Sequence, residues 1–183
     1  MDASRILDRS DMERPRRPSE LLAWVMAKCN ELGATPDAKA FARSGALLPK
    51  KFYDEVYPLA LFADREFAGR DDVLVQPNLD NDNFDGRITV GAGPGRRTIF
   101  VEVTYAKDGY DEARRMEVLC REGHVSLTGS VSSAGRKGSP NRKVHVESEA
   151  VSHLAALEDY LAIVRERLKD KARSRYGKDH VRG

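Results

Sequence analysis

The sequence predicts an α/β protein, more narrowly a mixed sheet packed with helices in the α+β manner. Apolar residues recur with helical spacing over about the first seventy residues, and the period changes to that of strands from Asp72. A helical stripe returns near the C-terminus. The chain has 183 residues, 40% hydrophobic and 33% charged, which is enough to bury one core within a charged shell. Fibrous and disordered classes and a large multidomain enzyme are excluded.

The N-terminal part is predicted to be helical after a short arm. Residues 1–17 alternate acidic and basic side chains with few apolar ones, so we expect a flexible N-terminal arm followed by a single domain over residues 18–183. Apolar residues at helical spacing predict three helices, over residues 19–33, 36–44 and 48–69. Thr35 followed by Pro36 is a typical helix start, and Pro58 is expected to bend the third helix.

The central and C-terminal parts are predicted to contain strands and two further helices. Residues 73–75 form a short strand, and residues 84–91 and 98–105 flank a Gly/Pro-rich turn that is typical of a hairpin. The elements expected after the hairpin are a helix over 110–122, a strand over 124–131, a mobile basic loop over 132–143, and a long C-terminal helix over 149–175.

The hairpin turn determines which residues face each other. A turn centred on Gly93 and Pro94 gathers nearly all the apolar residues on one face. The predicted pairs on that face are Phe84 with Val103, Gly86 with Val101, Ile88 with Ile99, and Val90 with Arg97. The other face then holds Asp85 directly across from Glu102. Two carboxylates therefore meet on the polar side of the hairpin.

Two like charges roughly 5 Å apart on a sheet need a compensating positive charge. A divalent cation is one candidate, because Mg²⁺ prefers oxygen ligands from one or two carboxylates together with water and substrate phosphate. The ordinary alternative is that Arg87, two positions along on the same face, neutralises the pair as part of a surface cluster.

The order of elements resembles the core of the PD-(D/E)xK, or restriction-endonuclease-like, nuclease superfamily. The matching order is helix, strand, strand with Asp85, strand with Glu102-Val103-Thr104, helix and strand, over roughly residues 50 to 131. The resemblance implies that Asp85 and Glu102 hold Mg²⁺ or Mn²⁺, and that Thr104 stands at the position of the lysine that orients or activates the attacking water. The stretch also resembles an uncharacterised bacterial family that shares this core, with Glu-Val-Thr in place of Glu-x-Lys.

This sequence departs from the superfamily pattern at two positions. The proline that precedes the aspartate is Phe84 here, and Thr104 cannot supply the positive charge of an ammonium beside a phosphate. Arg114 or Arg115 on the following helix is expected to reach in, and we predict a catalytic role for Thr104 and Arg115. Glu55 on the preceding helix is a candidate third acid, although a solvated surface residue is the more ordinary interpretation.

Positive charges in the predicted basic loop suggest a nucleic-acid partner. Arg136, Lys137, Arg142 and Lys143 are expected to follow the phosphate backbone of DNA near the carboxylates. A solvated charged face is the alternative for this loop, which contains no aromatic residue for base stacking. The net charge of only +2 does not by itself indicate a nucleic-acid binder.

The cysteine content and the N-terminus predict a cytoplasmic protein that does not enter the membrane. Cys29 and Cys120 are the only cysteines and give no disulfide framework. No apolar run approaches the roughly 20 residues of a membrane span, and residues 1–17 do not look like a signal peptide.

The leading hypothesis is a Mg²⁺-dependent nuclease-like protein that hydrolyses phosphodiester bonds in DNA through an activated water. The alternative is an inactive descendant of that fold, which acts as a binding or scaffolding module and forms a homodimer through the C-terminal helix. Leucine and valine at a/d-like spacing in that helix permit dimerisation, although packing onto its own sheet is the more ordinary use.

Overall fold

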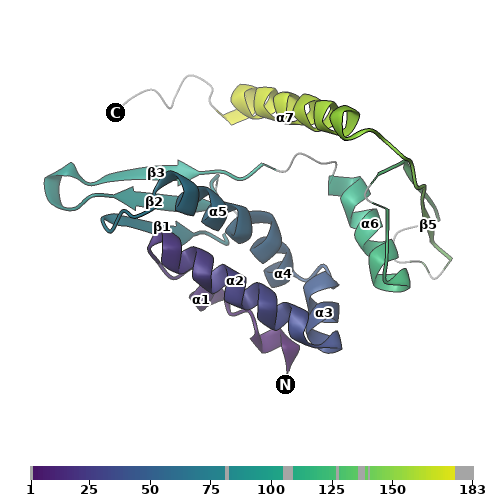
Figure 1. Cartoon of the computed structure of the whole chain (residues 1–183), viewed down its shortest axis with the longest axis horizontal. Coiled ribbons are helices and arrows are strands. Elements are labelled where there is room, and N and C mark those ends of the chain that lie inside the picture. Colours follow the sequence, from purple (N-terminus) through teal and green to yellow (C-terminus); the bar gives the residue numbers. More distant parts are fainter. Residues whose placement is uncertain are drawn as a thin grey trace. The chain divides into compact units, whose positions relative to one another are not determined.

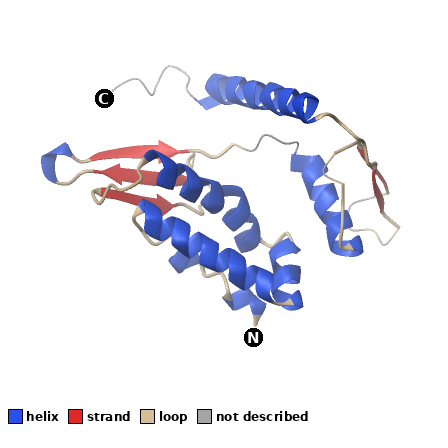
Figure 2. Cartoon of the chain, in the orientation of Figure 1, coloured by secondary structure: helices blue, strands red, loops and turns tan. Residues whose placement is uncertain are grey.

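The computed structural model describes residues 2–80, 83–104, 109–126, 128–135, 139 and 141–175. The fold is mixed α+β, with helices and two small antiparallel sheets (Figures 1 and 2). The chain divides into two compact units, Met1–Val103 and Thr104–Gly183, where we expected a single domain from residue 18. We refer to them as unit 1 and unit 2.

The N-terminal segment is folded against unit 1, so the expectation of a flexible arm over residues 1–17 is wrong. It forms a 3₁₀ turn, Ala3–Arg5, and a short helix α1, Arg9–Met12. Leu7 is 2% exposed and Met12 is completely buried, and both belong to the core. Two apolar side chains are too few to give a periodic signal in a charged segment, although both are used for packing.

A backbone bridge fixes the end of this N-terminal segment. The N–H of Arg16 donates to the carbonyl of Val75 at 3.0 Å, and the N–H of Val75 donates back at 2.8 Å. The Arg16 guanidinium lies 4.4 Å from the ring centroid of Trp24 and pairs with Asp11, whose other carboxylate oxygen accepts from the Trp24 indole at 2.9 Å. These contacts compensate the charge of the Arg16 side chain, which is only 9% exposed.

The first two predicted helices are confirmed. Helix α2 spans Pro18–Ala34, and helix α3 spans Pro36–Arg43. The Thr35 hydroxyl accepts from the N–H of Ala38 at 3.2 Å, which is the N-cap that the Thr-Pro pair predicts.

The third predicted helix contains a wide turn next to its proline. It consists of α4, Leu47–Lys51, a π-helical turn, Phe52–Val56, and α5, Tyr57–Glu66. Pro58 has no N–H for an intrahelical bond, and the N–H of Tyr57 donates to the carbonyl of Phe52, five residues back. The predicted irregularity at Pro58 thus takes the form of a π turn just before it.

The sheet of unit 1 is an antiparallel meander in the order β1–β2–β3, and its register is as predicted. The strands are β1, Val73–Pro77, β2, Gly86–Val90, and β3, Arg97–Val101. The pairs Gly86 with Val101, Ile88 with Ile99 and Val90 with Arg97 all form as expected. The strands are shorter than predicted, since the paired ladder ends at Gly86 and Val101.

Helices α2 and α5 contact β1 and provide the core of unit 1 (Figure 1). Phe52, Leu59 and Ile88 are among the largest side chains with no exposure. A Cβ at Gly86 would collide with the Leu59 side chain, so glycine at this position allows α5 to approach β2 closely.

Unit 2 contains α6, Gly109–Glu122, a hairpin of β4, Val131–Ala134, and β5, Lys143–Val146, and the long helix α7, His153–Arg175. Helix α6 confirms the prediction for 110–122. The predicted strand over 124–131 is wrong, because the described residues from 124 to 130 form no strand and β4 begins at Val131, where it pairs with β5. Both ends of the predicted loop over 132–143 therefore lie in strands.

Helix α7 confirms the predicted C-terminal helix but begins later than residue 149. The Ser152 hydroxyl caps it by accepting from the N–H of Ala155 at 3.1 Å. Among the residues the structure describes, no helix combines the length and the apolar character needed to cross a membrane. Neither Cys29 nor Cys120, both in the described part of the chain, forms a disulfide bond.

Candidate functional site

Asp85 lies between the ends of all three strands of unit 1. Its N–H donates to the carbonyl of Val101 at 2.8 Å, and its carbonyl accepts from the N–H of Asn78 at 2.9 Å. Its carboxylate Oδ2 accepts from the N–H of Val103 at 2.7 Å, just beyond β3. Asp85 thus ties the start of β2 to the segment that carries Glu102.

The arrangement of Asp85 and Glu102 differs from the expected cross-strand pair. Both residues lie just beyond the end of the ladder and are half-buried. A backbone N–H next to Glu102 satisfies the Asp85 carboxylate, which relieves the repulsion that a direct pair of carboxylates would suffer. No hydrogen bond to the second oxygen of Asp85, Oδ1, occurs in the described part of the chain.

The position of the Phe84 ring also differs from the prediction. It was expected on the apolar face opposite Val103, but its ring lies against that of Phe100, with centroids 4.8 Å apart and planes tilted by 54°. Phe100 is paired with Arg87 on the face opposite to buried Ile88. Side chains alternate between the two faces of the sheet only from Gly86 onward, so the residues before Gly86 need not lie on the predicted face.

Glu55 is the acidic residue that the structure brings close to Asp85. Only 17% of its side chain is exposed, so the solvated-surface interpretation is wrong. Burial raises the pKa of Glu55, and the negative charge of Asp85 raises it further. Its Oε2 atom is buried and has no hydrogen-bond partner among the described residues, which is costly for a carboxylate unless a ligand or cation contacts it.

Lys51 supplies a positive charge at the same place, and sequence reasoning did not single it out. Its Nζ lies 2.9 Å from Oε1 of Glu55, and only 16% of the Lys51 side chain is exposed. The two residues are four apart in the helical segment that runs from α4 into the π turn. This spacing is the feature of the sequence from which the ion pair could have been predicted. The ion pair lowers the pKa of Glu55, but burial outweighs it.

Two of the predicted catalytic residues, Thr104 and Arg115, belong to unit 2. Thr104 is half-buried at the start of that unit. Arg115 donates from Nη1 to the carbonyl of Ser126 at 2.9 Å and from Nη2 to the carbonyl of Gly129 at 2.7 Å. These bonds give Arg115 a structural role, because they hold the segment before β4 against α6.

The predicted DNA-binding residues fall into three groups. Arg136 and Lys137 lie outside the described residues. Arg142 is only 10% exposed and pairs with Glu117 at 3.2 Å, so its charge is used within unit 2 and does not belong to a mobile loop. Lys143 begins β5 and is exposed to solvent.

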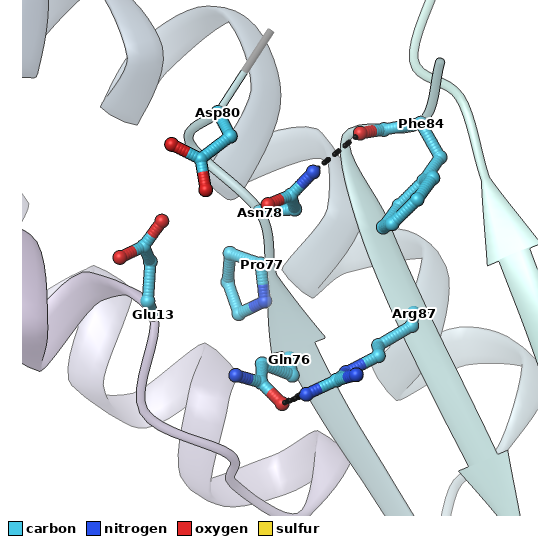
Figure 3. Close-up of a pocket in the computed structure, with 7 residues that line it drawn as sticks. All are labelled: Glu13, Gln76, Pro77, Asn78, Asp80, Phe84 and Arg87. Carbon is cyan, nitrogen blue, oxygen red and sulfur yellow. Dashed lines mark hydrogen bonds between the residues drawn. The ribbon is translucent and has the colours of Figure 1, made fainter. Parts of the chain in front are cut away.

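A pocket of about 280 Å³ lies at the end of β1 and the start of β2 (Figure 3). Its polar side chains largely bond to one another or to the chain. Gln76 Oε1 accepts from Arg87 at 2.9 and 2.6 Å, and Asn78 donates to the carbonyl of Phe84 at 3.1 Å. Glu13 and Asp80 both pair with Arg9. We therefore place the candidate site at Asp85 and Glu55, not in this pocket.

The donor set limits the kind of metal that this place could hold. No group of three or more His, Cys, Asp or Glu side chains with metal-binding spacing occurs among the residues that the structure describes. Glu55 and Asp85 together provide two carboxylates, which suits Mg²⁺ with water in its remaining positions and does not suit a structural zinc site. The buried, unpartnered Oε2 of Glu55 is the atom that fits such a cation.

Comparison with known proteins found no match: no protein-family model fits the chain, and no curated protein and no solved structure proved similar to it.

Proposed function

We propose that unit 1 is a Mg²⁺-dependent, nuclease-like module that hydrolyses phosphodiester bonds in DNA, with Asp85 and Glu55 as its central carboxylates. The observation that carries this proposal is the buried Oε2 of Glu55, which has no hydrogen-bond partner in the part of the chain that the structure describes and belongs to a side chain near a second carboxylate. The antiparallel meander preceded by a helix is also the order of elements in the restriction-endonuclease-like core.

The residues have complementary roles in this proposal. Glu55 and Asp85 would hold Mg²⁺ with water in its remaining positions, and bound Mg²⁺ would supply a Lewis acid for a phosphoryl oxygen. Lys51 supplies the ammonium charge that Thr104 cannot, and its ion pair fixes the Glu55 carboxylate through Oε1.

Metal binding is tested by thermal unfolding of the full chain with and without millimolar Mg²⁺ or Mn²⁺. A ligand that binds only the folded state raises the melting temperature. We expect a rise of several degrees for the wild type and a much smaller one for Glu55→Gln and Asp85→Asn. Glu66→Gln is the matched control, since Glu66 is exposed on the same run of helices. No shift in the wild type, or equal shifts in all variants, would refute the metal site.

Hydrolysis is tested separately with supercoiled plasmid and single-stranded DNA in Mn²⁺. Nicking should be lost in Glu55→Gln and Asp85→Asn and strongly reduced in Lys51→Met, whereas Glu66→Gln should cleave like the wild type. Cleavage that persists in both carboxylate variants would show that the activity comes from elsewhere.

A second candidate function is that of an inactive binding or scaffolding module with this fold. The observation that favours it is the use of Asp85 Oδ2 as the acceptor for the Val103 N–H, which gives the carboxylate a structural role without any metal. The absence of both a Mg²⁺-dependent thermal shift and DNA cleavage would select this second function.

A further inference from the structure

Helix α7 presents a narrow apolar seam to solvent. Five residues with alternating spacings of three and four lie on one side of this helix, as in a coiled coil: Leu154, Leu157, Leu161, Val164 and Leu168. The exposed fractions of the leucines are 69%, 50%, 45% and 56% in chain order. Such a row of exposed leucines is the kind of surface that associates with another helix.

The charges of α7 are separated along its length. Glu158 and Asp159 lie in the N-terminal half, whereas the C-terminal half, residues 165–175, has six basic residues and only two acidic ones, Glu166 and Asp170. A second helix that ran parallel would place the basic halves side by side. An antiparallel helix of the same sequence would place each acidic end beside a basic one, and it would also oppose the helix dipoles.

We propose that the α7 helices of two copies of this chain pair in an antiparallel manner. Two two-fold registers give four apolar layers, and we favour the one with Leu157 opposite Leu168 and Leu161 opposite Val164 of the partner subunit. The other register, with Leu154 opposite Val164, would place Glu158 opposite the same residue of the second copy. Each contact then occurs twice, as in any two-fold interface. The seam residues from Leu157 to Leu168 therefore form four apolar layers without an insertion or a polar residue among them, and Leu154 lies outside these layers.

The residues that flank the seam match in this same register. On one flank, Glu158 lies opposite Arg165 of the partner subunit, so two ion pairs form in the dimer. On the other flank, Tyr160 lies opposite Arg167 of the partner subunit, which suits a cation–π contact. Because the seam and both flanks agree on one register, a second copy is the occupant that this face fits.

The experiment measures the association state of the full chain by sedimentation equilibrium. We expect a dimer for the wild type and a monomer for Leu161→Asp, which changes an exposed residue and leaves the fold intact. Leu47→Asp is the matched control, since Leu47 is 64% exposed in unit 1 and should not affect association. Circular dichroism of each variant verifies that the helices persist.

A charge exchange distinguishes the proposed register from other arrangements. Glu158→Arg alone and Arg165→Glu alone should each weaken the dimer about tenfold, because each places like charges opposite one another twice. The double variant Glu158→Arg/Arg165→Glu should restore the wild-type affinity. A monomeric wild type at high micromolar concentration, an unaffected Leu161→Asp dimer, or a double variant no tighter than the single ones would overturn the proposal.

Discussion

The hydrogen bond between Asp85 and Val103 makes a direct prediction about the stability of unit 1. In Asp85→Ala the N–H of Val103 loses the carboxylate acceptor that lies 2.7 Å away. A hydrogen bond to a charged group contributes about 1.5–3 kcal/mol, and the half-exposed position of Asp85 places the loss near 1.5–2 kcal/mol. Asp85→Asn keeps a neutral acceptor, so its loss should be about 0.5–1 kcal/mol.

The assay is urea unfolding without metal, followed by the fluorescence of Trp24. Trp24 is the only tryptophan in the sequence and packs against the core of unit 1, so its signal reports this unit alone. For a unit of this size the urea dependence is about 1–2 kcal/mol per molar, so the midpoint for Asp85→Ala should fall by about 1 M.

An exposed aspartate provides the control for this prediction. Asp71 pairs with Arg17 at 3.0 Å, but its side chain is 85% exposed, so Asp71→Ala should cost less than about 0.5 kcal/mol. If Asp85→Ala unfolds at the same urea concentration as Asp71→Ala, the Asp85 carboxylate does not hold the end of β3. Since no metal is present, this result is independent of the proposed function.

Two further predictions concern Glu55 and Met12. Burial and the charge of Asp85 raise the folded-state pKa of Glu55, so its contribution to stability is complete at low pH and declines as the pH rises through that value. The stability of Glu55→Gln relative to wild type should therefore increase with pH in urea titrations, and a pH-independent difference would contradict this. Met12 is completely buried, so Met12→Ala should cost about 2–5 kcal/mol in thermal unfolding. Met26→Ala, at a residue that is 46% exposed, should cost less than about 1 kcal/mol, and similar losses for both would show that residues 2–17 do not contribute to the core.

The sequence predicted the meander register well because local chemistry determines it. The Gly/Pro turn sets the phase of the hairpin, and alternating Ile88 and Val90 must face the helices, so only one register buries them. The prediction failed beyond Gly86, where alternation ends and the contacts of Asp85 are made by loop backbone instead.

The burial of Glu55 was not predicted because the direction of its side chain depends on the π turn. A five-residue turn before Pro58 rotates the helix relative to a regular α-helical pattern, so the spacing of the residues does not tell which face is buried. The N-terminal segment was missed for another reason. Its anchors are a backbone bridge and the stacking of Arg16 on Trp24, and neither leaves an apolar period in the sequence.

The bridge between Arg16 and Val75 also has a consequence for how unit 1 folds. Arg16 is synthesised well before Val75, so the segment over residues 2–17 cannot reach its final place until β1 has emerged from the ribosome. Contacts between residues so distant in sequence must overcome the entropy of closing the intervening loop. During translation, α2 and α3 can therefore form before β1 fixes the end of the N-terminal segment, and an N-terminal fusion would act on this late docking step.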